Sequence, residues 1–107
     1  MLKGISVNDR VEITSEFDKD DVKTIFVLRP LDGEEYNNFM NPESDKLHLV
    51  GTRIYDFLEK TVVEIRNFPV AGTVREQLKS IKDQRVIAWL VRESGKLNNM
   101  TEEDAKN

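Results

Sequence analysis

The sequence contains no cysteine and only one histidine, His48, and both scarcities exclude kinds of chemistry. Without thiols there is no disulfide, no thiol catalysis, no iron–sulfur cluster and no cysteine-based zinc site. A single histidine excludes a multi-histidine metal site. The glycine-rich phosphate-binding motifs GxGxxG and GxxxxGK[ST] are also missing. We therefore expect neither a cofactor nor a metal.

Long hydrophobic runs are missing as well. No apolar stretch approaches the roughly 20 residues that a helix needs to cross a bilayer. Residues 1–6 lack the apolar segment of a signal peptide. We expect a cytoplasmic protein that does not enter a membrane.

What is present suits one small domain. The chain has 107 residues, 38% of them hydrophobic and 34% charged, and domains commonly contain about 100–150 residues. At this length a folded chain buries roughly two thirds of the surface that its unfolded form exposes, so a core is possible without disulfides. We predict a single domain over residues 1–107.

Charge is distributed unevenly along the chain. The net charge is −4, which disfavours general binding to nucleic acid. Residues 1–50 carry 6 basic and 11 acidic side chains, whereas residues 60–100 carry 8 basic and 4 acidic ones. This asymmetry is compatible with a head-to-tail contact between copies, and equally with an ordinary solvated surface.

The first part of the chain has the pattern of two strands. Residues 10–14 alternate polar and apolar side chains, and residues 22–28 form a β-branched and aromatic run that ends before Pro30. The connector, residues 15–21, has a length compatible with a hairpin. Its acidic cluster lacks the ligand spacing of an EF-hand loop. We predict an antiparallel hairpin region over residues 1–30.

Residues 31–96 have the pattern of a helical region. Asp32 and Glu35 form a capping box for a short helix ending near Met40, and Thr73 with Glu76 forms another for residues 74–81. The strongest helical periodicity extends over residues 47–65 and ends at Asn67-Phe68-Pro69.

A last helix is predicted over residues 85–92. Ser80 and Asp83 form a third box before it, and Ser94-Gly95 is its expected end. Residues 97–107 begin like another capped helix, but we expect them to be a frayed tail.

These elements predict an α+β fold in which the N-terminal antiparallel hairpin packs beside three or four helices. A two-stranded sheet is only marginally stable alone, so its apolar face must pack on a helix or its edge must pair with another chain, which would produce oligomers. The expected core includes Val27, Phe39, Ile54, Phe57, Leu58, Ile65, Ile87 and Leu90.

No catalytic constellation is evident, and we expect a protein that is not an enzyme. Carboxylate pairs such as Asp56 with Glu59, or Glu102 with Glu103, are common on solvated helix surfaces. The only tryptophan, Trp89, lies in an apolar stretch, which favours a place in the core over a nucleic-acid platform.

The order of several short motifs resembles the small tail assembly chaperones of long-tailed bacteriophages and prophages. The resemblance covers most of the chain: residues 2–9, residues 24–31 followed by Glu35-Tyr36, a helix ending in residues 65–68, and a last helix followed by residues 97–107. Relatives often carry a tryptophan before the Asn-Phe pair, where this chain has Ile65-Arg66.

The resemblance implies a non-enzymatic protein that binds the tape-measure protein and keeps its apolar helices soluble while tail-tube subunits polymerise around it. The tail-tube protein would be a second partner. Such a chaperone acts in the bacterial host cytoplasm, is absent from the mature virion, and is often also made in a longer, frameshifted form.

The contact surface should be an apolar groove or an exposed helix face. The sequence offers Phe57, Leu58, Trp89 and Val91 as candidate partner-binding residues. Two other functions fit the same patterns. One is a structural tail or head-tail connector protein, and the other is a small regulatory module that binds a protein or DNA through the basic residues 60–100.

Overall fold

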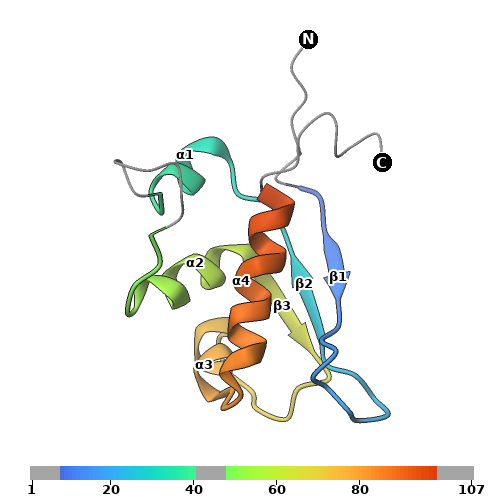
Figure 1. Cartoon of the computed structure of the whole chain (residues 1–107). Helices are drawn as coiled ribbons and strands as arrows, with labels where there is room; N and C mark the ends of the chain where they lie inside the picture. Colours follow the sequence, from blue (N-terminus) through green and yellow to red (C-terminus); the bar gives the residue numbers. More distant parts are fainter. Residues whose placement is uncertain (1–7, 41–47, 99–107) are drawn as a thin grey trace.

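The computed structural model describes residues 8–40 and 48–98, and it confirms the α+β class (Figure 1). Within these residues, a three-stranded antiparallel sheet with the order β1-β2-β3 is combined with four helices. Helix α4 lies against one face of the sheet, and α2 and α3 lie beside it. The elements are β1 (Val11–Ile13), β2 (Ile25–Leu28), α1 (Gly33–Asn37), α2 (Arg53–Thr61), β3 (Val62–Arg66), α3 (Val74–Ser80) and α4 (Gln84–Asn98).

The predicted hairpin is confirmed, although its strands are shorter than expected. Val11 pairs with Leu28, and Ile13 pairs with Phe26. The second strand begins only at Ile25 because Asp18 holds the preceding loop: its carboxylate accepts hydrogen bonds from the backbone N–H groups of Asp20 and Thr24. These backbone hydrogen bonds lower the pKa of Asp18.

The prediction of one helix over residues 47–65 is wrong at both ends. Residues 48–50 lie outside any helix, α2 ends at Thr61, and Val62–Arg66 form the third strand, β3. The β-branched residues of this segment suit a strand, and β2 has a free edge that needs a partner. Phe26 pairs with Ile65 across the β2–β3 ladder. The sheet is therefore not the isolated two-stranded ribbon that the sequence suggested.

The junction between α2 and β3 is hydrogen-bonded to the residue that follows β2. The buried Thr61 hydroxyl donates a hydrogen bond of 2.7 Å to the carbonyl of Arg29, and the N–H of Arg29 donates to the carbonyl of Thr61 at 2.8 Å. An irregularity of the ladder between Val27 and Leu28 lies beside this junction. These two hydrogen bonds fix where the helix ends and the strand begins.

The chain leaves β3 through a residue in the left-handed conformation. Asn67 has φ +58°, a region that asparagine adopts more readily than most residues. Its side-chain amide donates to the carbonyl of Lys23, and its own carbonyl accepts a hydrogen bond from the Thr24 hydroxyl. The predicted end of a helix at this point is wrong, because the segment that ends here is strand β3.

Two predicted helix starts are confirmed. Asp32 and Glu35 form a complete capping box on α1, which ends at Asn37, short of the expected Met40. The Thr73 side chain accepts a hydrogen bond from the N–H of Glu76 at the start of α3.

Helix α4 differs from its prediction at both ends. The Asp83 carboxylate caps it by accepting from the N–H of Arg85, whereas Ser80 donates to the carbonyl of Gln77 in α3. At the other end, the helix continues through Gly95 to Asn98. There the Asn98 side chain accepts a hydrogen bond from the N–H of Leu31, so contacts with the rest of the domain hold the last turn in place. The first two residues of the predicted frayed tail thus belong to α4, and the rest of it lies outside the described residues.

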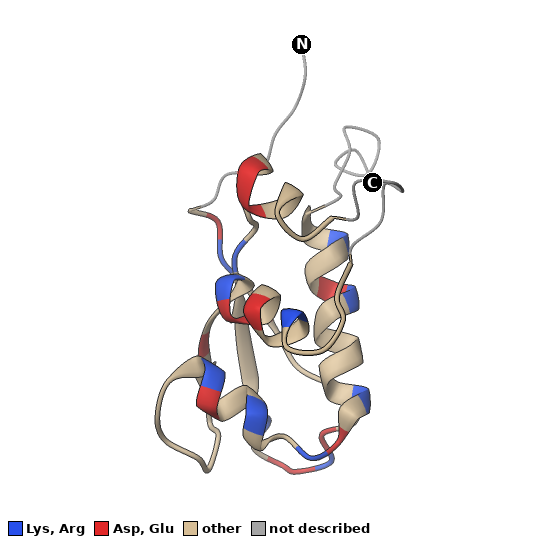
Figure 2. Ribbon diagram, turned by 90° about the vertical axis from the view of Figure 1, so that its left-hand side faces the viewer, with Lys and Arg blue, Asp and Glu red and all other residues tan. Residues whose placement is uncertain are grey.

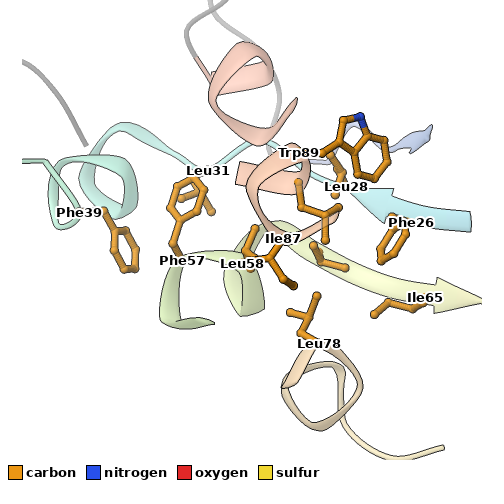
Figure 3. Close-up of a cluster of buried hydrophobic side chains, with 12 residues drawn as sticks. Phe26, Leu28, Leu31, Phe39, Phe57, Leu58, Ile65, Leu78, Ile87 and Trp89 are labelled. Carbon is orange, nitrogen blue, oxygen red and sulfur yellow. The ribbon is translucent and has the colours of Figure 1, made fainter. Parts of the chain in front are cut away.

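The core lies between the sheet and the helices (Figure 3). Trp89 packs edge-on against Phe26, with ring centroids 5.8 Å apart, as expected for a core tryptophan. Seven of the eight predicted core residues are buried, and the eighth, Ile54, is partly buried. The buried apolar side chains on this side are Phe26, Leu28, Leu31, Phe39, Phe57, Leu58, Val62, Ile65, Leu78, Ile87, Trp89 and Leu90.

An ion pair beside the core predicts acid sensitivity. The Arg29 guanidinium donates two hydrogen bonds to Glu35, at 3.2 and 3.0 Å, and holds the pKa of that carboxyl below its ordinary value of 4.5. A carboxyl whose folded-state pKa is lowered stabilises the fold above its unfolded-state pKa, and this stabilisation is lost as the pH falls through the lowered value. Glu35→Gln should therefore lower stability at neutral pH and weaken its dependence on pH below about 4.5.

Thermal unfolding between pH 7 and pH 3 measures this effect. Glu34→Gln is the matched control, because Glu34 lies in the same first turn of α1 but is exposed. Equal pH profiles for the two variants would contradict the role of the Arg29–Glu35 pair.

Candidate partner-binding groove

A shallow apolar groove of about 300 Å³ lies between α4 and the segment that leads into α2. Only one of its lining side chains, Gln84, is polar, and the groove opens to solvent. The lining residues are Leu49, Ile54, Gln84, Ile87, Ala88 and Val91.

One wall of the groove comes from the helical periodicity of α4. Gln84, Ile87, Ala88 and Val91 follow one another at steps of three, one and three residues, which places them on one side of the helix. Ile87 is buried, Val91 is partly buried and Ala88 is exposed. The helix thus offers apolar surface that continues from the core to the solvent.

The other wall comes from residues 49–54, and Arg53 holds this segment in place. Its guanidinium donates to the carbonyl of His48 at 2.7 Å and to the carbonyl of Asn38 at 2.9 Å. It also lies over the ring of Phe39, 5.4 Å from the centroid. Leu49 and Ile54 are therefore held against the core, while the neighbouring Val50 is 63% exposed.

One basic residue of α4, Arg92, lies next to the groove. Arg92 lies one turn beyond Ala88, is exposed, and has no ion-pair partner within residues 8–40 and 48–98. Figure 2 shows other basic residues along α4, but Arg85 is paired with Asp83, and Lys96 lies in a different groove with Glu93. An apolar floor with one arginine at its border suits an amphipathic helix that carries an acidic side chain beside its apolar face.

The structure separates the four residues predicted to bind a partner. Phe57 and Leu58 have no exposed surface, and Trp89 is 7% exposed. Phe57 instead packs edge-on against Phe39, with ring centroids 5.4 Å apart. Val91 alone among the four lines the groove. In this conformation the other three offer a partner almost no surface.

A larger, polar cleft of about 690 Å³ lies on another side of α2. Its two acidic residues, Asp56 and Glu59, both accept hydrogen bonds from one nitrogen of Arg75, at 2.7 and 2.9 Å, which raises the pKa of Arg75. The carboxylate pair that the sequence singled out on this helix is thus engaged with an arginine. The second such pair, Glu102 and Glu103, lies outside the described residues.

Metal and membrane sites receive no support from the described part of the chain. Within residues 8–40 and 48–98, no group of three acidic or histidine side chains is placed to hold a metal ion. The single histidine, His48, is exposed. No described helix combines the length and apolar character needed to span a bilayer.

Sequence reasoning missed most of the groove. Ala88 and Gln84 lie on the side of α4 next to Val91, but nothing in the sequence showed that residues 49–54 would face them. The sequence feature that could have indicated the groove is the pair of adjacent large apolar residues Leu49 and Val50. The structure places both of them outside any helix or strand.

Comparison with known proteins gives no relative. No family model matches the sequence, and neither a curated protein nor a solved structure matches it significantly.

Proposed function

We propose that this protein is a non-enzymatic phage tail assembly chaperone that binds the tape-measure protein and keeps it soluble until tail-tube subunits assemble. The motif order described above supports the family, and the apolar groove supports the binding role. The groove carries the proposal because a chaperone of this kind needs an exposed apolar surface for helices, and the described residues provide one between α4 and residues 49–54.

The tape-measure segment would bind as a helix with its apolar face against Ile87, Ala88 and Val91. Acidic side chains along its edge would meet Arg92. A groove of about 300 Å³ accommodates only a few side chains at once, so each contact would be weak. Weak contacts repeated along a long partner suit a protein that must leave when the tube polymerises.

A substitution at the open wall of the groove tests this mode of binding. Ala88→Glu places a charge where the apolar face of the helix would lie, next to Val91. Co-expressed with the tape-measure protein of the same phage, the native chain should raise the soluble yield of that protein, and Ala88→Glu should remove most of the increase. The readout is the amount of tape-measure protein in the soluble fraction and its co-purification with the chain.

Ala71→Glu is the matched control, because Ala71 is also exposed but lies in the loop before α3. It should keep the native effect. Equal loss in both variants would contradict binding in the groove, and failure of the native chain to raise the yield would contradict the chaperone function itself. Mass spectrometry of purified virions separates the structural alternative, because a tail or connector protein would be found in the particle.

A further inference from the structure

Strand β1 forms one edge of the sheet (Figure 1). Its inner side pairs with β2, and within the two described stretches no strand pairs with its outer side. The backbone groups along such an edge can form hydrogen bonds with another strand. Val11 in this strand is 37% exposed, although it is a large apolar residue.

An apolar groove of about 270 Å³ adjoins this edge. Its floor is formed by side chains of the sheet and by Leu97 of α4, and two opposite charges, Glu93 and Lys96, lie on its α4 side. The edge and the groove together form one surface of open backbone and apolar side chains. The full lining is Val11, Ile13, Leu28, Glu93, Lys96 and Leu97.

We propose that two copies of this chain pair through their β1 edges, antiparallel and about a twofold axis, to form a continuous six-stranded sheet. A twofold interface uses the same patch on both copies, so each charge in the patch needs an opposite charge within the same patch. The surface beside β1 meets this condition, since the groove carries Glu93 and Lys96 on α4, and along the edge Glu12 of the strand follows Arg10, which directly precedes the strand.

The charges also select a register. In an antiparallel pair, side chains directly opposite each other point to the same face of the sheet. A twofold axis perpendicular to the sheet keeps this arrangement only if it passes through a residue that pairs with its own copy, and not between two residues. An axis at Glu12 would oppose two carboxylates, which is unfavourable even though each already accepts a hydrogen bond from Arg66 of its own copy at 2.9 Å. An axis at Val11 opposes the two Val11 side chains and places Arg10 of each copy opposite Glu12 of the other. An axis at Ile13 would place Glu12 opposite the uncharged Thr14 and form no such ion pair, so we assign the axis to Val11.

The α4 charges add to this arrangement. Glu93 and Lys96 lie one turn apart and form a long ion pair of 3.5 Å within one copy. When the two grooves meet about the axis, Lys96 of each copy faces Glu93 of the other. The pairing closes both apolar grooves and provides partners for the open backbone groups of β1. It thereby accounts for an edge strand that carries the exposed apolar residue Val11.

Sedimentation velocity of the intact protein, from micromolar to near-millimolar concentration, tests the proposal. The native chain should show a species of twice 12.4 kDa that dissociates on dilution. Val11→Lys, which opposes two lysines at the axis, should raise the dissociation constant about tenfold or more. Val22→Lys is the matched control, because Val22 is 69% exposed in the hairpin loop, and it should dimerise like the native chain.

A second set of variants tests the α4 charges. Glu93→Lys should weaken the dimer, and combining it with Lys96→Glu should restore it, because the exchanged pair is again complementary about the axis. A native chain that stays monomeric at every concentration, or a Val11→Lys variant that dimerises as well as Val22→Lys, would overturn the proposal. The experiment contains no tape-measure protein, so its result is independent of the proposed chaperone function.

Discussion

Phe57→Ala is expected to lower the free energy of unfolding by about 3–5 kcal/mol, the usual loss for removing a buried phenylalanine side chain. Phe57 has no exposed surface, and its ring packs edge-on against Phe39 at an interplanar angle of 79°. A domain of this size has a total stability of about 5–15 kcal/mol, so the variant should lose a large share of it. Urea denaturation followed by circular dichroism measures the change.

Val22→Ala provides the control for this experiment. Val22 is 69% exposed, and its truncation should change the free energy of unfolding by less than about 0.5 kcal/mol. If Phe57→Ala lost no more stability than Val22→Ala, the placement of Phe57 in the core would be contradicted.

Thr61→Val is expected to lower the free energy of unfolding by about 1–3 kcal/mol, although it barely changes the shape of the side chain. The Thr61 hydroxyl is the donor to the carbonyl of Arg29 at the α2–β3 junction, and valine leaves that acceptor without this hydrogen bond. The same urea denaturation experiment measures the loss. The effect is expected because a buried polar group without a partner retains its full desolvation penalty.

Ser94→Ala should not lower the free energy of unfolding, which makes it a stringent comparison. Ser94 is also fully buried, but its hydroxyl has no hydrogen-bond partner among the described residues. Removing it should leave stability unchanged or raise it by up to about 1 kcal/mol. Similar losses for Thr61→Val and Ser94→Ala would show that the hydrogen bond to Arg29 is not the cause.

Local signals in the sequence predicted local structure well. The capping residues of α1 and α3 act within four residues, so Asp32 with Glu35 and Thr73 with Glu76 identified both helix starts. The hairpin was predicted because its two strands are neighbours along the chain. In each of these cases the residues that determine the structure are the residues that adopt it.

Strand β3 could not be predicted in the same way. Val62 and Ile65 are three residues apart, a spacing that continues the helical pattern of α2, and both are buried in the observed strand as well. This segment forms a strand because it pairs with the free edge of β2, which lies more than thirty residues earlier in the chain. No window of sequence around residue 62 contains that information.

The groove was predictable only in part, for a similar reason. The apolar side of α4 includes both Val91, which lines the groove, and Leu90, which is fully buried. Periodicity identifies the side, but it does not show where a neighbouring segment leaves it uncovered. That depends on residues 49–54, whose position is fixed by the contacts of Arg53 with two backbone carbonyls.

The position of β2 between β1 and β3 has a consequence for how the chain folds. Pairing Ile13 with Phe26 closes a loop of 13 residues, whereas pairing Phe26 with Ile65 closes one of 39 residues, counted as differences between the paired numbers. A threefold longer loop costs about 1 kcal/mol more in chain entropy. The hairpin can therefore form early, and the addition of β3, which requires the intervening helices to collapse around it, is the step expected to limit the folding rate.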